Sequence, residues 1–194
     1  MSIRFAREAD LPQILGLYAP YVAETTVSFE YEVPTLSEFS HRFLTITRQF
    51  PWLVWEEDGR ILGYAYGSAP FERAAFSWVA EDSVYLRPEA RGRGIGTALC
   101  RTLEEILKIQ GYRKIYAIIT SENFTSLEFH RKMGYSPVSE FQNCGFKFGR
   151  WLGITWLDKE LQSVDSPSSF PIPWREIMHN RQKFSDILGI LSLS

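Results

Sequence analysis

The sequence predicts an α/β protein built around a mixed β-sheet, and three observations carry that prediction. Short apolar segments typical of strands alternate with amphipathic segments typical of helices. The dipeptide Asp58-Gly59 between two apolar runs is a strong signal for a two-residue β-hairpin. A turn with glycines at positions 92, 94 and 96 separates a strand from a long helix. At 194 residues, 45% of them hydrophobic, the chain fits one globular domain with a short appendage.

The first half of the chain reads as a strand, two helices and a hairpin. Asp10 is a good N-cap, and Pro12 fits the first turn of the helix that follows, where a missing N–H costs nothing. Thr35 and Glu38 have the spacing of a capping box at the start of a second helix. The expected elements are a strand at 3–6, a helix at 11–22, an extended segment at 25–32, a helix at 36–47, and strands at 52–55 and 61–68.

The second half of the chain continues the alternation. Gly111 is suited to end a long helix, because glycine adopts the left-handed conformation at low cost. Thr125 and Glu128 repeat the spacing of a capping box, and Gly134 is suited to end the short helix that they open. The expected elements are a strand at 83–86, a helix at 95–110, a strand at 113–120, a short helix from 125 to 134, and the last strands within 146–161.

After Leu161 the composition changes. Residues 163–170 are rich in serine and proline, as linkers are, so we expect a main domain at 1–162 and an extension at 171–194. Apolar residues in the extension recur at helical spacing, which predicts a helix over 174–191 that packs either on its own domain or across a dimer. The stripe of this helix consists of Trp174, Ile177, Met178, Arg181, Phe184, Ile187, Leu188 and Leu191, with only Arg181 polar.

Composition and charge exclude several classes of protein. Twenty-one basic against 23 acidic residues leave a net charge of −2, so no overall positive field exists to hold nucleic acid. Cys100 and Cys144 lie far apart in the sequence and the three histidines are scattered, so we expect no metal site. No run of apolar residues approaches 18, and the first residues lack an apolar signal core. We therefore expect a cytoplasmic protein with no nucleic-acid or membrane partner.

The most informative segment is the glycine-rich turn between a strand and the long helix. Its glycines, Gly92, Gly94 and Gly96, let backbone N–H groups converge at the positive end of a helix dipole. Arg91 and Arg93 stand between them and add positive charge. Such a turn is suited to cradle a pyrophosphate. An ATP-type P-loop is excluded because no Gly-Lys-Ser/Thr follows the glycines, and a dinucleotide-binding fingerprint is excluded because the spacing differs.

The same turn resembles a motif of a known family. The pattern Arg91-x-x-Gly94-x-Gly96 after a strand resembles the acetyl-CoA pyrophosphate motif of the GNAT superfamily of N-acetyltransferases. The resemblance covers about residues 2–161. It includes similarity at 4–10 to the family's opening strand and helix, at 123–135 to its later cofactor motif, and at 26–30, 81–85, 127–130 and 145–151 to the phosphinothricin acetyltransferase branch.

The sequence departs from that branch in two places. Gly153 stands where the branch usually has Asp after the Trp, and the extension has no counterpart. Because the family commonly pairs its subunits through the C-terminal strands, the apolar segment 146–157 predicts a homodimer. The large apolar residues of this segment include Phe146, Phe148, Trp151 and Trp156.

The resemblance implies a mostly antiparallel central sheet, splayed at the cofactor site and flanked by helices, with acetyl-CoA as co-substrate and no metal. The pantetheine arm is expected to bond the strand before the glycine turn as an added strand would, with a backbone N–H near Leu86 polarising the thioester carbonyl. Asn123 is expected to bond the pantetheine from the other side of the splayed sheet. The cofactor-binding residues implied in this way are Val84, Tyr85, Leu86, Arg91, Gly92, Arg93, Gly94, Ile95, Gly96, Thr97, Asn123 and Ser126.

The resemblance also assigns two catalytic residues. An amine attacks a thioester only as the neutral base, and Glu81 matches the glutamate that acts as base, through water, in phosphinothricin-type enzymes. From the residues alone, Glu81 would be a solvated strand end. His130 stands where many GNAT enzymes carry a tyrosine that protonates the leaving thiolate. It is either that acid or a packed, hydrogen-bonded histidine.

The implied reaction is acetyl transfer to the α-amine of a small amino-acid-like acceptor of the phosphinothricin, methionine sulfoximine or methionine sulfone type. Arg73 is the candidate to grip the acceptor carboxylate, with an exposed loop arginine as the alternative. The residues implied around the acceptor are Phe29, Glu30, Phe71, Arg73 and Phe76. Two other functions stay open: acetylation of another amine or of a protein N-terminus, and a non-catalytic acyl-CoA-binding sensor.

Overall fold

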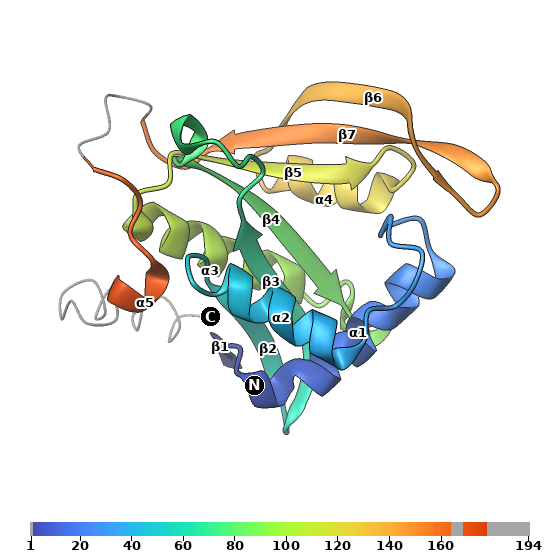
Figure 1. Cartoon of the computed structure of the whole chain (residues 1–194), viewed down its shortest axis with the longest axis horizontal. Helices are drawn as coiled ribbons and strands as arrows, with labels where there is room; N and C mark the ends of the chain where they lie inside the picture. The colour runs from blue at the N-terminus through green and yellow to red at the C-terminus, as the bar shows by residue number, and fades with distance from the viewer. Residues whose placement is uncertain (1, 164–168, 178–194) are drawn as a thin grey trace.

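The computed structural model describes residues 2–163 and 169–177, whose strands join in one sheet in the order β1-β2-β3-β4-β5-β7-β6 (Figure 1). Every pairing is antiparallel except that of β4 with β5, which is parallel. The strands are β1 Ser2–Phe5, β2 Trp52–Glu57, β3 Arg60–Ser68, β4 Val79–Leu86, β5 Lys114–Thr120, β6 Ser136–Lys147 and β7 Arg150–Glu160. The helices are α1 Leu11–Glu24, α2 Leu36–Ile46, α3 Ile95–Gln110, α4 Phe124–Lys132 and α5 Trp174–Ile177. The mixed-sheet α/β fold predicted from the sequence is confirmed.

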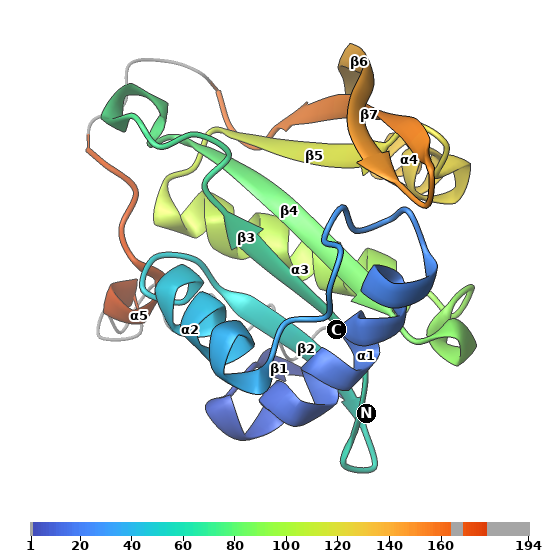
Figure 2. The same cartoon turned by 45° about the vertical axis from the view of Figure 1, so that its right-hand side comes forward.

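Helices cover both faces of the central strands. Figures 1 and 2 show α1 and α2 on one face of β2–β4 and α3 on the other. Because side chains alternate along a strand, β2 sends Trp52 and Val54 to the α1/α2 side and Leu53 and Trp55 to the α3 side, where each pair joins a separate buried cluster. Within the described residues, no helix is long and apolar enough to cross a membrane.

Several local signals are found as expected. The Thr35 side chain accepts from the Glu38 N–H, and the Glu38 carboxylate accepts from the Thr35 N–H, as a capping box requires. Gly111 and Gly134 adopt positive φ angles of 105° and 93° at the ends of α3 and α4. The Asp58-Gly59 turn joins β2 to β3. These signals depend only on neighbours in the sequence, which explains why they could be predicted.

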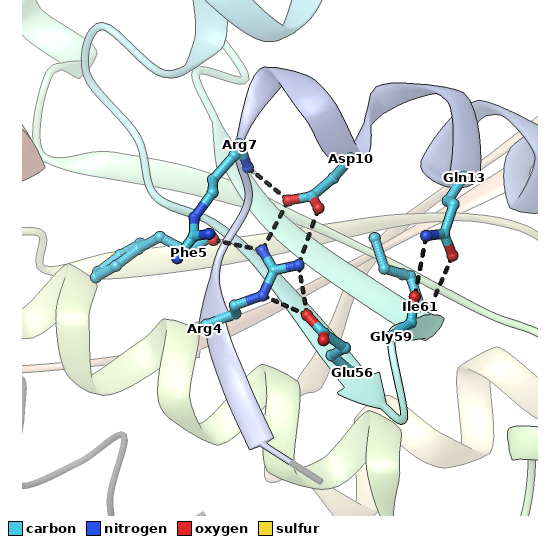
Figure 3. A network of polar contacts seen from close by, with 8 residues as sticks. All are labelled: Arg4, Phe5, Arg7, Asp10, Gln13, Glu56, Gly59 and Ile61. Carbon is cyan, nitrogen blue, oxygen red and sulfur yellow. Dashed lines mark hydrogen bonds and ion pairs between the residues drawn. The ribbon is translucent and has the colours of Figure 1, made fainter.

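Asp10, in contrast, does not cap α1 through its side chain (Figure 3). Its carboxylate accepts two hydrogen bonds from the guanidinium of Arg4, at 2.7 and 2.9 Å, and one from the backbone N–H of Arg7. Arg4 also donates to Glu56 on β2, at 2.6 Å. The carboxylate therefore ties the first strand to the start of α1, and α1 is preceded by a 3₁₀ turn at Glu8–Asp10.

Three other expectations about secondary structure need correction. The cap of α4 is Asn123, whose side chain accepts from the Ser126 N–H, and not Thr125 with Glu128. The segment expected to be extended at 25–32 is an irregular loop. Strand β6 begins at 136, ten residues before the last strands were expected, because two register shifts against β7 hide its alternation.

The sheet opens between β4 and β5. Their parallel pairing covers only Val79–Glu81 against Lys114–Tyr116, after which the two strands diverge (Figure 2). The following residues of β4 therefore have no strand partner on the β5 side. Helix α4, which follows β5, lies beside the wide end of this opening, so the sheet is splayed as the family resemblance implied.

A buried lysine joins the last hairpin to the loop after α1. Lys147, 3% exposed, directs its Nζ at the carbonyl oxygens of Val22, Thr25 and Ser28, at 2.7, 2.9 and 2.6 Å. Val22 lies in the last turn of α1, where carbonyl groups lack partners within the helix. The ammonium group thus ends α1 and fixes the loop that carries Phe29 and Glu30 against β6.

The described part of the extension packs on its own domain. Trp174 stacks on Phe5 of β1 with ring centroids 4.4 Å apart, and its Nε1 donates to the Thr47 carbonyl. Gln110 at the end of α3 exchanges hydrogen bonds with the backbone of Ile172. Most of the linker and the remainder of the helix expected over 174–191 lie outside the described residues, which include α5 only to Ile177.

Replacing Lys147 by methionine should lower the free energy of unfolding by about 2–4 kcal/mol, because three carbonyl groups lose a charged donor in a dry environment. Urea denaturation measures this loss. The matched control is Lys132→Met on the exposed side of α4, where the ion pair with Glu128 is solvated, and a change within about 0.5 kcal/mol is expected. Equal losses in the two variants would show that the Lys147 contacts do not hold the loop.

Candidate active site

The glycine-rich turn leaves an open space at the start of α3. Gly92 and Gly94 have φ angles of 72° and 81°, and a Cβ atom built on either would meet nothing within 4 Å. Gly94 is the N-cap of α3 and has no side chain to accept from the first N–H groups of the helix. Gly96 has another role, because a Cβ there would lie only 3.3 Å from the Leu86 side chain and 3.6 Å from the Phe129 ring. The turn therefore fits an anion such as a pyrophosphate.

The two arginines of the turn have different partners. Arg91 donates to the Tyr21 hydroxyl at 3.1 Å, and its guanidinium lies over the Tyr21 ring. Arg93 forms a two-bonded ion pair with Glu57 at the end of β2, at 2.7 and 2.9 Å. Arg91 thus stays beside the end of β4, whereas Arg93 is held toward the β2–β3 hairpin.

A groove of about 60 Å³ follows the opening of the sheet. The Arg87 N–H donates to Leu62 on β3, so by alternation the backbone groups of Val84 and Leu86 face the opposite side, toward β5. The Leu86 N–H and carbonyl are both bonded to the Tyr21 hydroxyl. The groove is lined by Val27, Asp82, Ser83, Val84, Tyr85, Ala117, Ile118, Ile119, Thr120, Asn123, Ser126 and His130.

Helix α4 brings the later motif to this groove. Asn123 and Ser126 both line it. The Asn123 oxygen is used to cap α4, so the amino group of its side chain is the part left to donate to a ligand. The groove thus offers a strand backbone on one side and polar side chains of a helix start on the other.

Glu81 lies where β4 and β5 are still paired, directly before they diverge. It stands opposite Ser68 on β3 and Tyr116 on β5. Burial, together with the negative charge of the neighbouring Asp82, raises the pKa of Glu81 to about 7. A carboxylate with this pKa can accept a proton near neutral pH. Glu81 is therefore a half-buried residue with a displaced pKa and not a solvated strand end.

His130 is buried at 3% exposure on the other side of β4 from Glu81. Its Nε2 lies 3.2 Å from a carboxylate oxygen of Asp82, and its Nδ1 lies 2.8 Å from the Ser126 carbonyl. Glu81 and Asp82 are consecutive in the strand, so their side chains leave on opposite faces. The two expected catalytic residues therefore lie on the two faces of β4: His130 lines the groove, and Glu81 directly precedes the β4 residues that line it.

The residues expected around the acceptor divide into two groups. Phe71 stacks on Trp156 and contacts the edge of Tyr116, which links it to the strand position beside Glu81. Phe76 packs on Phe71. Arg73 is exposed and lines a separate groove of about 340 Å³ that also includes Phe76, Val79 and Phe170.

The second group belongs to the loop that Lys147 holds. The ring of Phe29 lies so close to Gly145 that a Cβ there would approach within 2.3 Å, which explains the glycine in β6. Glu30 forms an ion pair with Arg42 of α2. These contacts lie at β6 and α2, whereas Arg73 lines the separate groove, so the described part of the chain does not bring all five expected acceptor residues to one point.

Sequence reasoning missed three residues that the structure places at the site. Tyr21 bonds both backbone groups of Leu86, Asp82 bonds His130, and Arg42 pairs with Glu30. Each contact joins residues at least 12 positions apart in the sequence, and rules based on local spacing cannot predict such a pair. The position of Asp82 beside Glu81 in the strand was the one available signal.

Comparisons with known proteins agree with this geometry. Residues 3–156 match the family model described as an acetyltransferase (GNAT) domain. A phosphinothricin N-acetyltransferase from Alcaligenes faecalis is 36% identical over 169 residues, covering 85% of each chain. An L-methionine sulfoximine/L-methionine sulfone acetyltransferase from Pseudomonas aeruginosa is 38% identical over 169 residues, covering 85% of this chain and 97% of the relative.

A solved structure is similar over most of both chains. It is a GNAT superfamily phosphinothricin acetyltransferase from Sinorhizobium meliloti in complex with AcCoA, with a TM-score of 0.84 and 35% identity. The similarity covers 89% of this chain and 95% of that one. Taken with the glycine turn and the splayed sheet, these matches show that the chain belongs to the GNAT family of acetyltransferases.

Proposed function

We propose that the protein transfers an acetyl group from acetyl-CoA to the α-amine of a small amino-acid-like acceptor. The observation that carries the proposal is the groove between β4 and β5: in the sequence, Glu81 directly precedes the β4 residues that line it, and the glycine turn follows the end of β4. Acetyl-CoA supplies the acetyl group as a thioester. The turn at 92–97 would hold the pyrophosphate, and the backbone of Val84 would bond the pantetheine, with Asn123 and Ser126 opposite.

Glu81 is the base of the proposed reaction. An α-amine carries a proton near neutral pH, and it must lose that proton before it can attack. The pKa of Glu81 is raised to about 7, so its carboxylate is a stronger base than an ordinary glutamate. It can take the proton directly or through a water molecule. His130 is the candidate to give a proton to the leaving sulfur by way of Ser126, which lines the groove and whose hydroxyl lies 3.4 Å from His130 Nδ1.

The acceptor class rests on the relatives. Proteins 36% and 38% identical to this chain are named for phosphinothricin and for methionine sulfoximine or sulfone, which are amino-acid-like amines with a carboxylate. Arg73 remains the proposed partner of that carboxylate, and Phe71 and Phe76 would form an apolar wall beside it. Phe29 and Glu30 would approach from the loop after α1. An amine of another kind, including a protein N-terminus, is the second candidate.

We further propose a cytoplasmic homodimer whose subunits meet through β6 and β7. Phe146, Phe148 and Trp151 are 46%, 56% and 61% exposed on this hairpin, and so large an exposed aromatic group is typical of an interface. Trp156 is not part of this surface, because it packs under Phe71. In the proposed organisation, 1–162 form the acetyltransferase domain and 163–170 the linker. The extension at 171–194 would pack on its own subunit.

Release of free CoA thiol with a panel of amines tests the proposed function. Turnover is expected with methionine sulfone, methionine sulfoximine and phosphinothricin, and it should fall at least tenfold with the decarboxylated amine of similar size, which lacks the charge-assisted contact. Comparable rates with and without the carboxylate would favour the second candidate. Binding of acetyl-CoA without thiol release for any amine in the panel would favour the acyl-CoA sensor.

The variant Gly94→Val tests the pyrophosphate cradle. A side chain at this position would fill the space where the pyrophosphate is expected, so affinity for acetyl-CoA should fall at least tenfold by calorimetry. Gly59→Val is the matched control, because Gly59 has nearly the same φ, 77°, and equally open surroundings in the β2–β3 turn. Both variants should lose similar stability by thermal unfolding. A similar loss of acetyl-CoA affinity in both would refute the assignment.

The variant Glu81→Gln tests the base. Turnover should fall by about 10²–10⁴-fold with little change in acetyl-CoA affinity. In the wild type, kcat should rise with pH through about 7 as Glu81 loses its proton, and this rise should be absent in the variant. Glu160→Gln, at the exposed end of β7, is the control expected to keep both the rate and the pH profile. Wild-type turnover in Glu81→Gln would return Glu81 to a structural role.

A further inference from the structure

A cluster of polar side chains is buried between β4, α3, α4 and β7. We refer to it as the buried polar cluster. The Asp82 carboxylate is its centre, 3.2 Å from His130 Nε2 and 4.0 Å from the sulfur of Cys100, which donates to it. The side chains of Asp82 and His130 are only 1% and 4% exposed. The members of the cluster are Asp82, Cys100, Glu104, His130, Tyr135 and Lys159.

Both ring nitrogens of His130 face acceptors. Nε2 faces the Asp82 carboxylate. Nδ1 lies 2.8 Å from the Ser126 carbonyl oxygen, which can only accept, and the Ser126 hydroxyl is more distant at 3.4 Å. A neutral imidazole carries one N–H and could donate to only one of them. The imidazolium carries two and donates to both. The contacts of His130 therefore match its charged form.

The charges of the cluster lead to the same form. Asp82 and Glu104 contribute two carboxylates, and Lys159 contributes one ammonium group, which lies 2.7 Å from Glu104. Cys100 and Tyr135 are neutral, since burial raises the pKa of both. One negative charge is thus left without compensation unless His130 is protonated. An unpaired charge in a dry site is costly, so the cluster favours the imidazolium.

We propose that Asp82 is a positioning residue of the acetyltransferase reaction, which holds His130 in one orientation as the imidazolium beside the groove. Because the same carboxylate is next to Glu81 in β4, its negative charge acts on the residues of both faces. It favours the protonated form of Glu81 and the protonated form of His130. This inference rests on the proposed roles of Glu81 and His130 in acetyl transfer.

The pKa shifts of the two residues agree with this placement. Burial lowers the pKa of His130, but the hydrogen bond and the charge of Asp82, with the Ser126 carbonyl and Glu104, raise it overall above the ordinary 6.5. Burial and then Asp82 raise the pKa of Glu81, whose face of the sheet also carries the neutral phenols of Tyr66 on β3 and Tyr85 on β4. A single substitution at Asp82 should therefore act on both titrations.

The pH dependence of kcat distinguishes positioning from mere packing. The rise of kcat with pH reports loss of the Glu81 proton, and its fall at higher pH reports loss of the His130 proton. In Asp82→Asn both limbs should move to lower pH, because repulsion on Glu81 and attraction on His130 disappear together. Glu104→Gln is the matched control: it removes a carboxylate from the same cluster, but only the His130 limb should move. A uniform loss of rate with both limbs unmoved in Asp82→Asn would overturn the proposal.

A measurement without turnover tests the charge of His130 directly. In ¹⁵N spectra of the imidazole rings of the wild type, with His130 assigned through His130→Gln, its signals should be those of an imidazolium at pH 7. Asp82→Asn should move the midpoint to lower pH, because the hydrogen bond and the charge of Asp82 are lost while the burial of the ring remains. A neutral His130 in the wild type at pH 7 would overturn the proposal even if no variant folds. If His130 is charged but no amine is acetylated, the proposed function fails and the role of Asp82 in holding the charge stands.

Discussion

The early parting of β4 from β5 is the constraint on which the site depends. Three residue pairs join the two strands, and beyond them the backbone groups of Val84 and Leu86 face an opening. Backbone N–H and C=O groups in a sheet need partners. Those of Leu86 are bonded to the Tyr21 hydroxyl, and in the proposed complex those of Val84 would bond an extended ligand. The start of α3 and the start of α4 lie at the borders of the same opening, so one irregularity of the sheet places both binding motifs.

The pleat of β4 gives two adjacent carboxylates different environments. Glu81 faces the aromatic side chains beneath α1 and α2, and Asp82 faces the polar cluster beneath α3 and α4. Alternation along a strand is thus enough to separate a residue suited to accept protons from one that is committed to a hydrogen bond. A shift of one residue in the register of β4 would exchange the two environments, which explains why the site lies where β4 is still paired on both sides.

The parts of the fold that sequence reasoning found are those with local causes. Helix ends are defined by contacts within one turn, as at Thr35 with Glu38, at Gly94 and at Gly111. The conformation of the glycine-rich turn likewise follows from its own residues. The parts that it missed have distant partners. Asp10 looks like a cap until Arg4 and Glu56 are seen beside it, and Asn123 replaced Thr125 as the cap of α4. The Lys147 contacts and the pair of Asp82 with His130 produce no regular spacing in the sequence, because their partners come together only in the completed sheet.

The stack of Trp174 on Phe5 joins the first strand of the chain to nearly the last residue described. During synthesis, α1, α2 and the β2–β3 hairpin can associate through contacts that are close in sequence, as soon as these residues have been made. Phe5 can pair with Leu53 of β2 at that stage, but 168 further residues separate it from Trp174, which stacks on its ring. The aromatic cover of the first strand is thus added last, so a ribosome that stops before the extension releases a protein whose Phe5 ring lacks this cover.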